Sequence, residues 1–139
     1  MNMSKQTFKM VKVNLNYRNT AVAVIKRKDG KVLITFNKRI NSVDKNFVDQ
    51  NSYKFPQGGI DRGETPVEAV LRELKEELGI DFSAVDITSR LNDYISYWFR
   101  NTGQPDFEIR LFAFLFEVED VGENSLKLDP MEVSEIRWV

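Results

Sequence analysis

One helix with clearly marked ends is the feature that most constrains the fold of this 139-residue chain. Thr65 is a favourable N-cap, Pro66 suits the first helical position, Glu68 is placed to close a capping box, and Gly79 ends the segment. Apolar residues recur between these ends at three- and four-residue steps, at Val67, Val70, Leu71, Leu74 and Leu78. This spacing predicts an amphipathic helix whose apolar face packs on a sheet.

Strand-like segments surround this helix. Residues 20–25 and 31–36 are apolar and β-branched, and the Asp29-Gly30 pair between them predicts a β-hairpin. The polar residues 37–52 are expected to form a long surface loop, and residues 53–55 a short strand that ends at Pro56. Further strands are expected around residues 85–88, 93–100, 108–118 and 135–139. Because strands outnumber helices around one strong helix, the predicted class is α+β with a mixed sheet.

The length and the residues that are absent narrow the function. A chain of 139 residues without repeats suits one domain, spanning residues 1–139. The apolar runs are far shorter than the ~20 residues that cross a membrane, and no secretory leader is visible at the start, so a cytoplasmic protein is expected. The chain has no cysteine and no histidine, which excludes thiol and imidazole chemistry. Proton transfer is therefore expected from a carboxylate, lysine, tyrosine or metal-bound water, and metal with carboxylate is the leading hypothesis.

The net charge of −1 conceals an uneven distribution. Residues 1–60 contain 12 basic and 3 acidic side chains, a net charge of +9. Residues 61–139 contain 8 basic and 18 acidic side chains, a net charge of −10. An acidic half that holds a metal ion and a basic half that meets a polyanionic substrate would explain this division, although a lysine-rich composition also contributes.

Three carboxylates share one side of the predicted helix. At about 100° per residue, Glu73, Glu76 and Glu77 fall within one sector, beside the apolar stripe. Like charges at i,i+4, here Glu73 and Glu77, destabilise a helix by roughly 0.2 to 0.5 kcal/mol, and a bound cation would reverse that sign. Oxygen ligands of this kind suit Mg²⁺. A solvated acidic helix face is the alternative, and the residues alone leave both open.

The segment from Gly58 to Ile80 resembles the signature of the Nudix hydrolases. Its pattern is G-x5-E-x7-R-E-U-x-E-E-x-G-U, with U aliphatic, and every specified position matches. The matching positions are Gly58, Glu64, Arg72, Glu73, Leu74, Glu76, Glu77, Gly79 and Ile80. The resemblance implies a Nudix fold, with a curved mixed sheet between helices and this segment forming a loop-helix-loop.

The same resemblance implies an activity and roles for these residues. Nudix hydrolases cleave a nucleoside diphosphate linked to another group, with Mg²⁺ or Mn²⁺. Glu73, Glu76 and Glu77 are then the expected metal ligands, with the Gly58 carbonyl as a further one. Arg72 and Glu64 are expected to orient them. The general base is either a glutamate of this segment or a later loop carboxylate, for which Glu132 is the candidate; an exposed loop glutamate without a role is the alternative.

Within that family the sequence looks most like RNA 5′-pyrophosphohydrolases and dinucleoside polyphosphate hydrolases. The likeness lies in Tyr17-Arg18, in the Phe-Pro-Gln-Gly-Gly-Ile run at residues 55–60, in Gly103-Gln104, and in Glu132 ahead of the terminal Arg-Trp-Val. Two departures affect substrate choice: residues 105–109 interrupt the run that follows Gly-Gln, and the loop at residues 37–52 is long. The chain also stops where relatives continue into a further C-terminal helix.

Substrate contacts follow from this reading. Phosphates are expected to meet a set of basic and polar residues from the basic half: Arg18, Lys38, Arg39, Lys54, Gln57 and Gly59. Aromatic residues that are candidates to stack a base are Tyr94, Tyr97, Trp98, Phe99 and Phe107. For each of these residues a surface or core role is the alternative, since strand alternation turns half of the aromatic side chains toward the core.

The leading hypothesis is a hydrolase of 5′-triphosphate RNA ends or of dinucleoside polyphosphates such as diadenosine tetraphosphate (Ap4A). The alternatives are a Nudix hydrolase of free nucleoside triphosphates or ADP-ribose, and a sensor that binds a nucleotide without turnover. The expected partner is the nucleotide or RNA substrate, with no membrane and no stable protein partner. The oligomeric state is left open.

Overall fold

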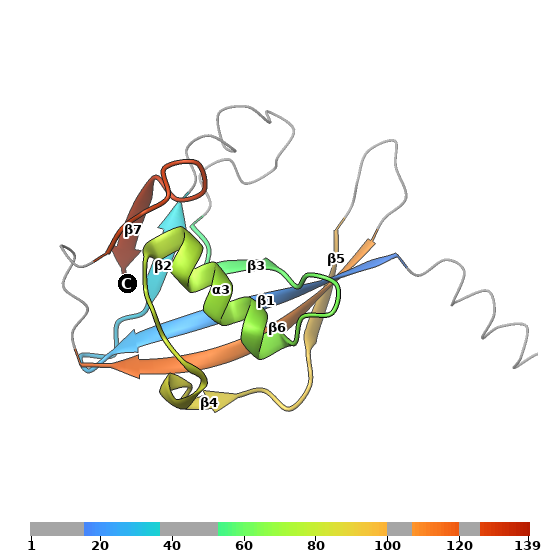
Figure 1. Cartoon of the computed structure of the whole chain (residues 1–139), viewed down its shortest axis with the longest axis horizontal. Helices are drawn as coiled ribbons and strands as arrows, with labels where there is room; N and C mark the ends of the chain where they lie inside the picture. The colour runs from blue at the N-terminus through green and yellow to red at the C-terminus, as the bar shows by residue number, and fades with distance from the viewer. Residues whose placement is uncertain (1–15, 37–52, 100–106, 120–125) are drawn as a thin grey trace, which may run out of the picture.

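The computed structural model describes residues 16–36, 53–99, 107–119 and 126–139 (Figure 1). The described elements are β1 (Tyr17–Arg27), β2 (Leu33–Phe36), β3 (Gln57–Gly59), α3 (Pro66–Leu78), the 3₁₀-helix η1 (Ala84–Asp86), β4 (Ser89–Arg90), β5 (Ile95–Phe99), β6 (Phe107–Val118) and β7 (Glu135–Trp138). In this part of the chain, no helix is both long and apolar enough to cross a membrane.

The main sheet is built on two long strands. β1 and β6 pair in parallel along their whole shared length, from Tyr17 opposite Glu108 to Arg27 opposite Val118. β3 pairs antiparallel with the other edge of β1, and β4 and β5 pair antiparallel with β6. The sheet is therefore mixed, and the predicted α+β class is confirmed. A separate two-stranded sheet joins β2 to β7.

The predicted hairpin is only partly present. The turn forms as expected, with Gly30 at φ 87° and the Asp29 carboxylate accepting a hydrogen bond from the Lys31 N–H at 3.0 Å. The two strands, however, share only one bridge, between Lys26 and Val32. β6 occupies one edge of β1, and β3 with the Pro56 carbonyl occupies the other. No long ladder with β1 is left for β2, which pairs with β7 instead.

Two other local predictions need correction. The short strand predicted at residues 53–55 is reduced to a bridge between Lys54 and Thr35, and the strand β3 begins only after Pro56. Residues 84–86 form η1 rather than a strand, and Val85 is 89% exposed. The reason is local, because the Asp86 carboxylate accepts hydrogen bonds from the Ser83 N–H at 2.7 Å and from its hydroxyl at 3.3 Å. Side-chain bonds of this kind compete with strand pairing.

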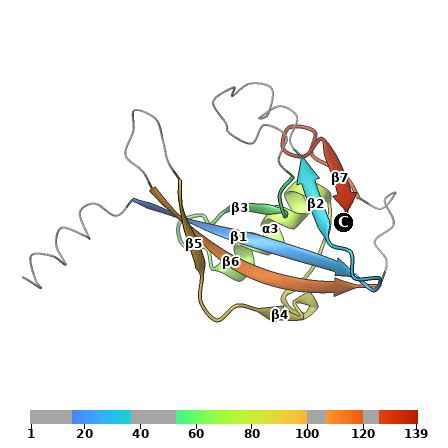
Figure 2. The same ribbon diagram turned by 180° about the vertical axis from the view of Figure 1, so that it is seen from behind.

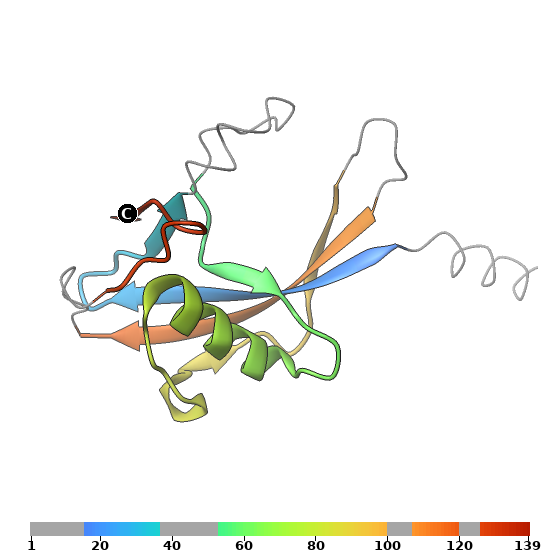
Figure 3. The same ribbon diagram turned by 45° about the horizontal axis from the view of Figure 1, so that its top comes forward.

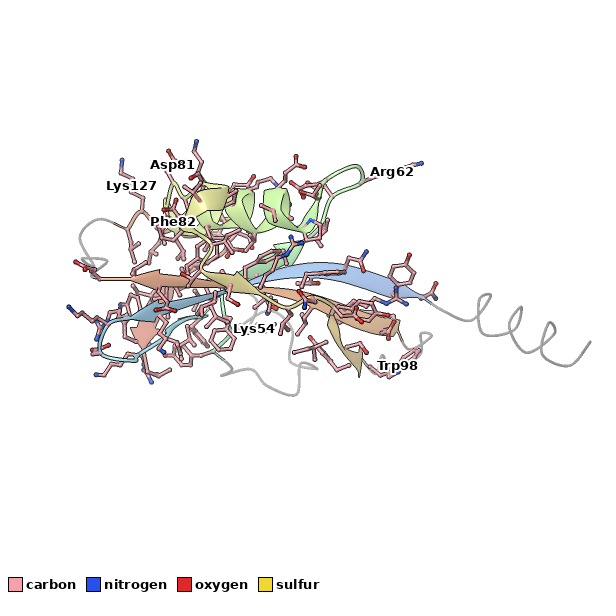
Figure 4. All side chains as sticks on the ribbon, turned by 90° about the horizontal axis from the view of Figure 1, so that it is seen from below. Lys54, Arg62, Asp81, Phe82, Trp98 and Lys127 are labelled. Carbon is pink, nitrogen blue, oxygen red and sulfur yellow. The ribbon has the colours of Figure 1, made fainter. Side chains whose placement is uncertain are left out.

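The core lies between α3 and one face of the main sheet (Figures 1 and 4). On the helix side, the predicted apolar stripe is confirmed: Val70, Leu74 and Leu78 are buried, and Val67 and Leu71 pack at its margin. On the sheet side, alternate residues of β1 and β6 are buried, namely Ala21, Ala23, Ile25, Phe114 and Phe116. Figure 4 shows α3 and η1 on one side of these strands and the β2–β7 pair on the other. The part of the chain that the structure describes contains no second α-helix.

Candidate functional site

The site is organised by the first turn of α3 and by the side of α3 that faces β3. Thr65 caps the helix by accepting a hydrogen bond from the Glu68 N–H at 3.1 Å, and Glu68 closes the capping box. At the other end, Gly79 adopts φ 69° and its N–H bonds to the Lys75 carbonyl at 3.1 Å. These two ends confirm the predicted helix limits. They fix the orientation of α3, which lies beside β3 (Figure 3), and so decide which side chains face the core.

Arg72 connects the glycine-rich turn to the helix. Its guanidinium donates two hydrogen bonds to the Glu64 carboxylate, at 2.8 and 3.0 Å, and one to the Gly59 carbonyl at 2.9 Å. A further hydrogen bond of 2.8 Å reaches Glu73, and a longer one of 3.3 Å reaches Glu76. The planar fork of arginine makes this many directed contacts, which the single ammonium of lysine cannot do. Arg72 therefore holds the turn and two of the three helix carboxylates.

The Glu64 carboxylate accepts hydrogen bonds from two different residues. Besides Arg72, its carboxylate accepts a hydrogen bond from the Asp61 backbone N–H at 2.9 Å. The hydrogen bond from Arg72, followed by the one from Asp61, lowers the pKa of Glu64. The Glu64 carboxylate is therefore charged at neutral pH and serves as a fixed anchor for the arginine.

Gly58 is required by the position of Glu73. A Cβ atom built on Gly58 would overlap the carboxylate of Glu73, whereas one built on Gly59 meets nothing within 4 Å. Glu73 therefore lies directly against the backbone of β3, which places a carboxylate beside the glycine whose carbonyl is a candidate metal ligand. The helix and the glycine-rich turn meet at this point.

Glu77 is the most unusual group of the site, since it is a carboxyl that is only 8% exposed. Burial is the main cause that raises the pKa of Glu77 to about 9; a hydrogen bond with Glu73 and the negative charges of Glu73, Glu132 and Glu76 add to it. The Glu77 carboxyl therefore favours its protonated form and hydrogen-bonds with Glu73. A positive charge beside Glu77 would favour its ionised form.

The segment that carries Glu132 is tied to the end of α3. The Asp129 N–H bonds to the Glu77 carbonyl at 2.9 Å, and the Lys127 N–H bonds to the Leu78 carbonyl at 2.9 Å. The Asp129 carbonyl then accepts bonds from Glu132 and Val133, so a tight turn follows. Figure 3 shows this turn, which precedes β7, beside the end of α3. Its position explains why the charge of Glu132 acts on Glu77.

The donor set suits a hard divalent cation, but its geometry is incomplete. Glu73 and Glu77 lie together beside Gly58, and all available donors are oxygens. Glu76 is turned toward Arg72 instead. Among the described residues, no three acidic side chains converge in a metal-binding arrangement. The chemistry of the pair fits a metal ion, and Glu76 would have to leave Arg72 to take part.

The predicted phosphate contacts lie at different distances from this centre. Gln57 and Gly59 belong to β3, on either side of Gly58. Lys54 is exposed and its backbone pairs with Thr35. Arg18 lies near the start of β1, with its guanidinium 4.6 Å from the centre of the Phe107 ring. Lys38 and Arg39 lie outside the described residues. The structure thus places Gln57 and Gly59 at the centre, and the role of the basic residues stays a prediction.

Sequence reasoning missed two residues that shape the site. Asp61 contributes the N–H that binds Glu64, and its carboxylate lies 3.4 Å from Arg72. Asp129 ties the Glu132 turn to the helix, and its carboxylate accepts a hydrogen bond from the Met131 N–H at 3.0 Å. An Asp-Pro pair followed by a turn is a weak signal for such a tether. Neither residue could be assigned to the site without the helix beside it.

Comparison with known proteins agrees with this geometry. Residues 16–139 match the family described as the NUDIX domain. An RNA pyrophosphohydrolase from Hydrogenovibrio crunogenus is 38% identical over 81 residues, which are 58% of this chain and 43% of that protein. An RNA pyrophosphohydrolase from Nitratiruptor is 53% identical over 49 residues, 35% of this chain and 30% of that protein. The matched stretches thus span less than half the length of these curated relatives.

Solved structures share the fold. The MutT protein of Methanosarcina mazei Go1 has a TM-score of 0.61 at 22% identity, covering 90% of this chain and 78% of that one. An Ap4A hydrolase of C. elegans has a TM-score of 0.56 at 18% identity, covering 87% of this chain and 78% of that one. At such identities the likeness concerns the fold alone.

Proposed function

The chain belongs to the NUDIX domain family, and we propose that it is a divalent-metal-dependent pyrophosphohydrolase of 5′-polyphosphate nucleotides. Its proposed substrates are 5′-triphosphate RNA ends, with dinucleoside polyphosphates such as Ap4A as the second member of the class. Water attacks a phosphoanhydride bond of the substrate in this reaction.

The observation that carries the proposal is the contact between the buried carboxyl group of Glu77 and the half-buried carboxylate of Glu73, which lies against Gly58. Burying one ionisable group beside another of the same charge is unfavourable unless a proton or a cation compensates them. The chain nevertheless holds Glu73 through Arg72, which is itself bound to Glu64 and to the Gly59 carbonyl, and Glu64 accepts a further bond from the Asp61 N–H. A cluster that serves only as a solvated helix face needs no such support. A cation and a polyphosphate that complete the site would offset the unfavourable free energy of placing the two carboxyl groups together.

Glu73, Glu76, Glu77 and the Gly58 carbonyl are the proposed ligands of Mg²⁺ or Mn²⁺. When bound, such an ion neutralises charge on phosphate oxygens and lowers the pKa of a coordinated water. Arg72 positions Glu73 through the 2.8 Å hydrogen bond, and Glu64 holds Arg72 in turn. Outer-shell contacts of this kind orient the ligands of a metal site.

The remaining roles fall to groups around the helix. Glu132 is the proposed base that accepts a proton from the attacking water, because the Asp129 turn holds it near Glu77. Gln57 and Gly59 are the proposed contacts for the phosphates beside Gly58, and Lys54, Arg18, Lys38 and Arg39 are proposed to meet the rest of the polyanion.

The choice of RNA ends as the first substrate rests on the named relatives. Both curated proteins described above carry the name RNA pyrophosphohydrolase. An Ap4A hydrolase shares the fold, which is why dinucleoside polyphosphates stand second.

One assay tests the proposal. The protein is incubated with Mg²⁺ and, separately, with 5′-triphosphate RNA, Ap4A, nucleoside triphosphates and ADP-ribose, and released phosphate, pyrophosphate and nucleotide are measured. We expect the highest kcat/KM with the RNA or Ap4A. Glu77→Gln should lower it roughly a thousandfold, which corresponds to about 4 kcal/mol in the transition state. Glu117→Gln, an equal change at an exposed position of β6, is the matched control. A higher kcat/KM with ADP-ribose or free nucleotides would change the proposed substrate class. Absence of turnover with every substrate would refute the proposal that the protein is an enzyme.

The proposed base has its own test. Glu132→Gln should lower kcat and remove one ionisation from the pH-rate profile, because the base must be deprotonated to act. A profile with unchanged shape would assign the base to a glutamate of α3 instead.

A further inference from the structure

The end of the main sheet where β1 begins and β5 pairs with β6 lies far from β2 and β7 (Figure 2), and several aromatic side chains are exposed there. Trp98 is 55% exposed and Tyr17 50%, and Tyr94 is also exposed. Trp98 lies at the β5 edge of the sheet, away from α3 (Figure 4). Isolated exposed apolar residues need no explanation, but a cluster of large rings on neighbouring strands marks a binding surface. We call Tyr17, Tyr94, Trp98 and Arg110 the aromatic end.

Strand register places these residues on one face. Tyr17 pairs with Glu108, which pairs with Trp98 on its other side. Two residues along, Asn19 pairs with Arg110, and two further on, Ala21 pairs with Phe112, whose ring lies 5.7 Å from that of Tyr94. Residues two apart on a strand share a face. This is the face that α3 covers at Ala21, so the aromatic end is its uncovered continuation.

The same face leads to the carboxylates. Ala21 pairs with Gly58 across β1 and β3, and Gly58 lies against Glu73. From Ala21 to Tyr17 is four residues, or about 13 Å along the strand. A stacked strand rises by ~3.4 Å per nucleotide, so about four nucleotides cover that distance. A substrate held by its 5′ phosphates at Gly58 therefore extends to the aromatic end if it is an RNA chain.

The cations of this region suit the same ligand. The Arg110 guanidinium lies 3.9 Å from the Tyr17 ring centre and 4.9 Å from that of Tyr94, so it fixes both rings. Glu108 is already paired with Arg110 at 2.6 Å. Arg18, next to Tyr17 on β1, lies on the opposite face of the sheet, with its guanidinium 4.6 Å from the centre of the Phe107 ring. Rings that stack bases beside a cationic side chain are the usual platform for single-stranded nucleic acid.

We infer that the aromatic end binds the unpaired nucleotides that follow the 5′ end of an RNA substrate, by stacking bases on Trp98 and Tyr17. The inference rests on the proposed function, because the 5′ phosphates at Gly58 set the direction of the chain. It assigns the surface to RNA rather than to a second copy of the protein.

The kinetic test compares substrates of different length. KM and kcat are measured for a single-stranded 5′-triphosphate RNA of eight nucleotides and for guanosine triphosphate, in the wild type, Trp98→Ala and Tyr17→Ala. We expect the KM for the RNA to rise about tenfold in each variant, or about 1.4 kcal/mol, within the range of base stacking on an aromatic ring. The ratio of kcat/KM for RNA to that for the mononucleotide should fall equally. Val85→Ala, at an exposed apolar residue of η1, is the control.

The outcomes separate the two ideas. If the wild type cleaves the RNA but both variants keep its KM within twofold, the inference is wrong and the proposed function stands. If the wild type cleaves no RNA, the RNA part of the proposed function fails, and a binding measurement decides the inference. In that measurement the same RNA should quench the tryptophan emission of the wild type, and much less that of Trp98→Phe, which retains Trp138. Equal quenching in the two proteins would refute the inference.

A dimer in sedimentation equilibrium that Trp98→Ala converts to monomer would assign the surface to a second copy instead.

Discussion

The two ends of the β1–β6 pair carry opposite kinds of surface although the same two strands form both. Around Ala23 and Phe116 the face is covered by α3 and fully buried. Around Tyr17 and Arg110 it is open. At the covered end Arg72 joins several groups in one hydrogen-bond network, whereas at the open end Arg110 forms one ion pair, with Glu108, and lies over two rings. The difference indicates a rigid region suited to chemistry and an accessible region suited to a variable ligand.

The largest stability difference should separate the two ends directly. Phe116→Ala removes a fully buried ring and should lower the free energy of unfolding by about 3 to 5 kcal/mol. Trp98→Ala removes a larger ring that is mostly in water and should change it by no more than about 0.5 kcal/mol. Urea unfolding of both variants gives the comparison. A similar loss in the two would mean that the aromatic end is covered in solution.

Arg72→Lys should come next, because it weakens the network without removing the charge. The lysine cannot keep the contacts to Glu64, Gly59 and Glu73 together. We expect kcat to fall about 10- to 100-fold, as for other groups that orient metal ligands. Arg62→Lys is the matched control, since Arg62 points away from the helix in the preceding loop (Figure 4). Equal kcat values for the two variants would show that any cation at position 72 suffices.

Gly58→Ala tests the closest approach between the strand and the helix. The added methyl group would overlap the Glu73 carboxylate, and we expect a loss of about 1 to 3 kcal/mol in the free energy of unfolding. Gly59→Ala adds the same group in open space and should leave that free energy nearly unchanged. Melting of the two variants side by side measures the contrast. Equal stability would mean that Glu73 moves aside without cost.

The covered end was largely predictable from the sequence. The caps at Thr65 and Gly79, the apolar stripe and the Gly58 to Ile80 pattern are local signals, and the helix they predict is present. The contact of Gly58 with Glu73, fifteen positions away, was not predicted, because the resemblance implied only that the Gly58 carbonyl is a further metal ligand; the contact is visible only in the structure.

The remaining features depend on long-range pairing, which local signals do not encode. The turn at Asp29 and Gly30 is real, but the partner of β2 was decided by competition for the edges of β1. The candidate stacking aromatics were named from the sequence as single residues. Tyr17 and Arg110 join them only because a parallel register places β1 beside β6. Asp129 likewise acquires a role only through the end of α3.

The smallest predicted effect concerns pH and the anchor of the network. The hydrogen bond from Arg72, and then that from the Asp61 N–H, lowers the pKa of Glu64 from its usual 4.5. A carboxyl whose pKa is lower in the folded state stabilises the fold above the unfolded-state value, and this contribution is lost as the pH falls through the folded-state value. Glu64→Gln removes the ionisation, so its free energy of unfolding should fall less than that of the wild type between about pH 6 and about pH 3. Urea unfolding across this range measures the two slopes, with Glu117→Gln as the control of equal charge. Identical slopes in wild type and Glu64→Gln would mean that the Arg72 network is held by Glu73 and Gly59 alone, and the covered end would then owe its rigidity to the helix rather than to the turn.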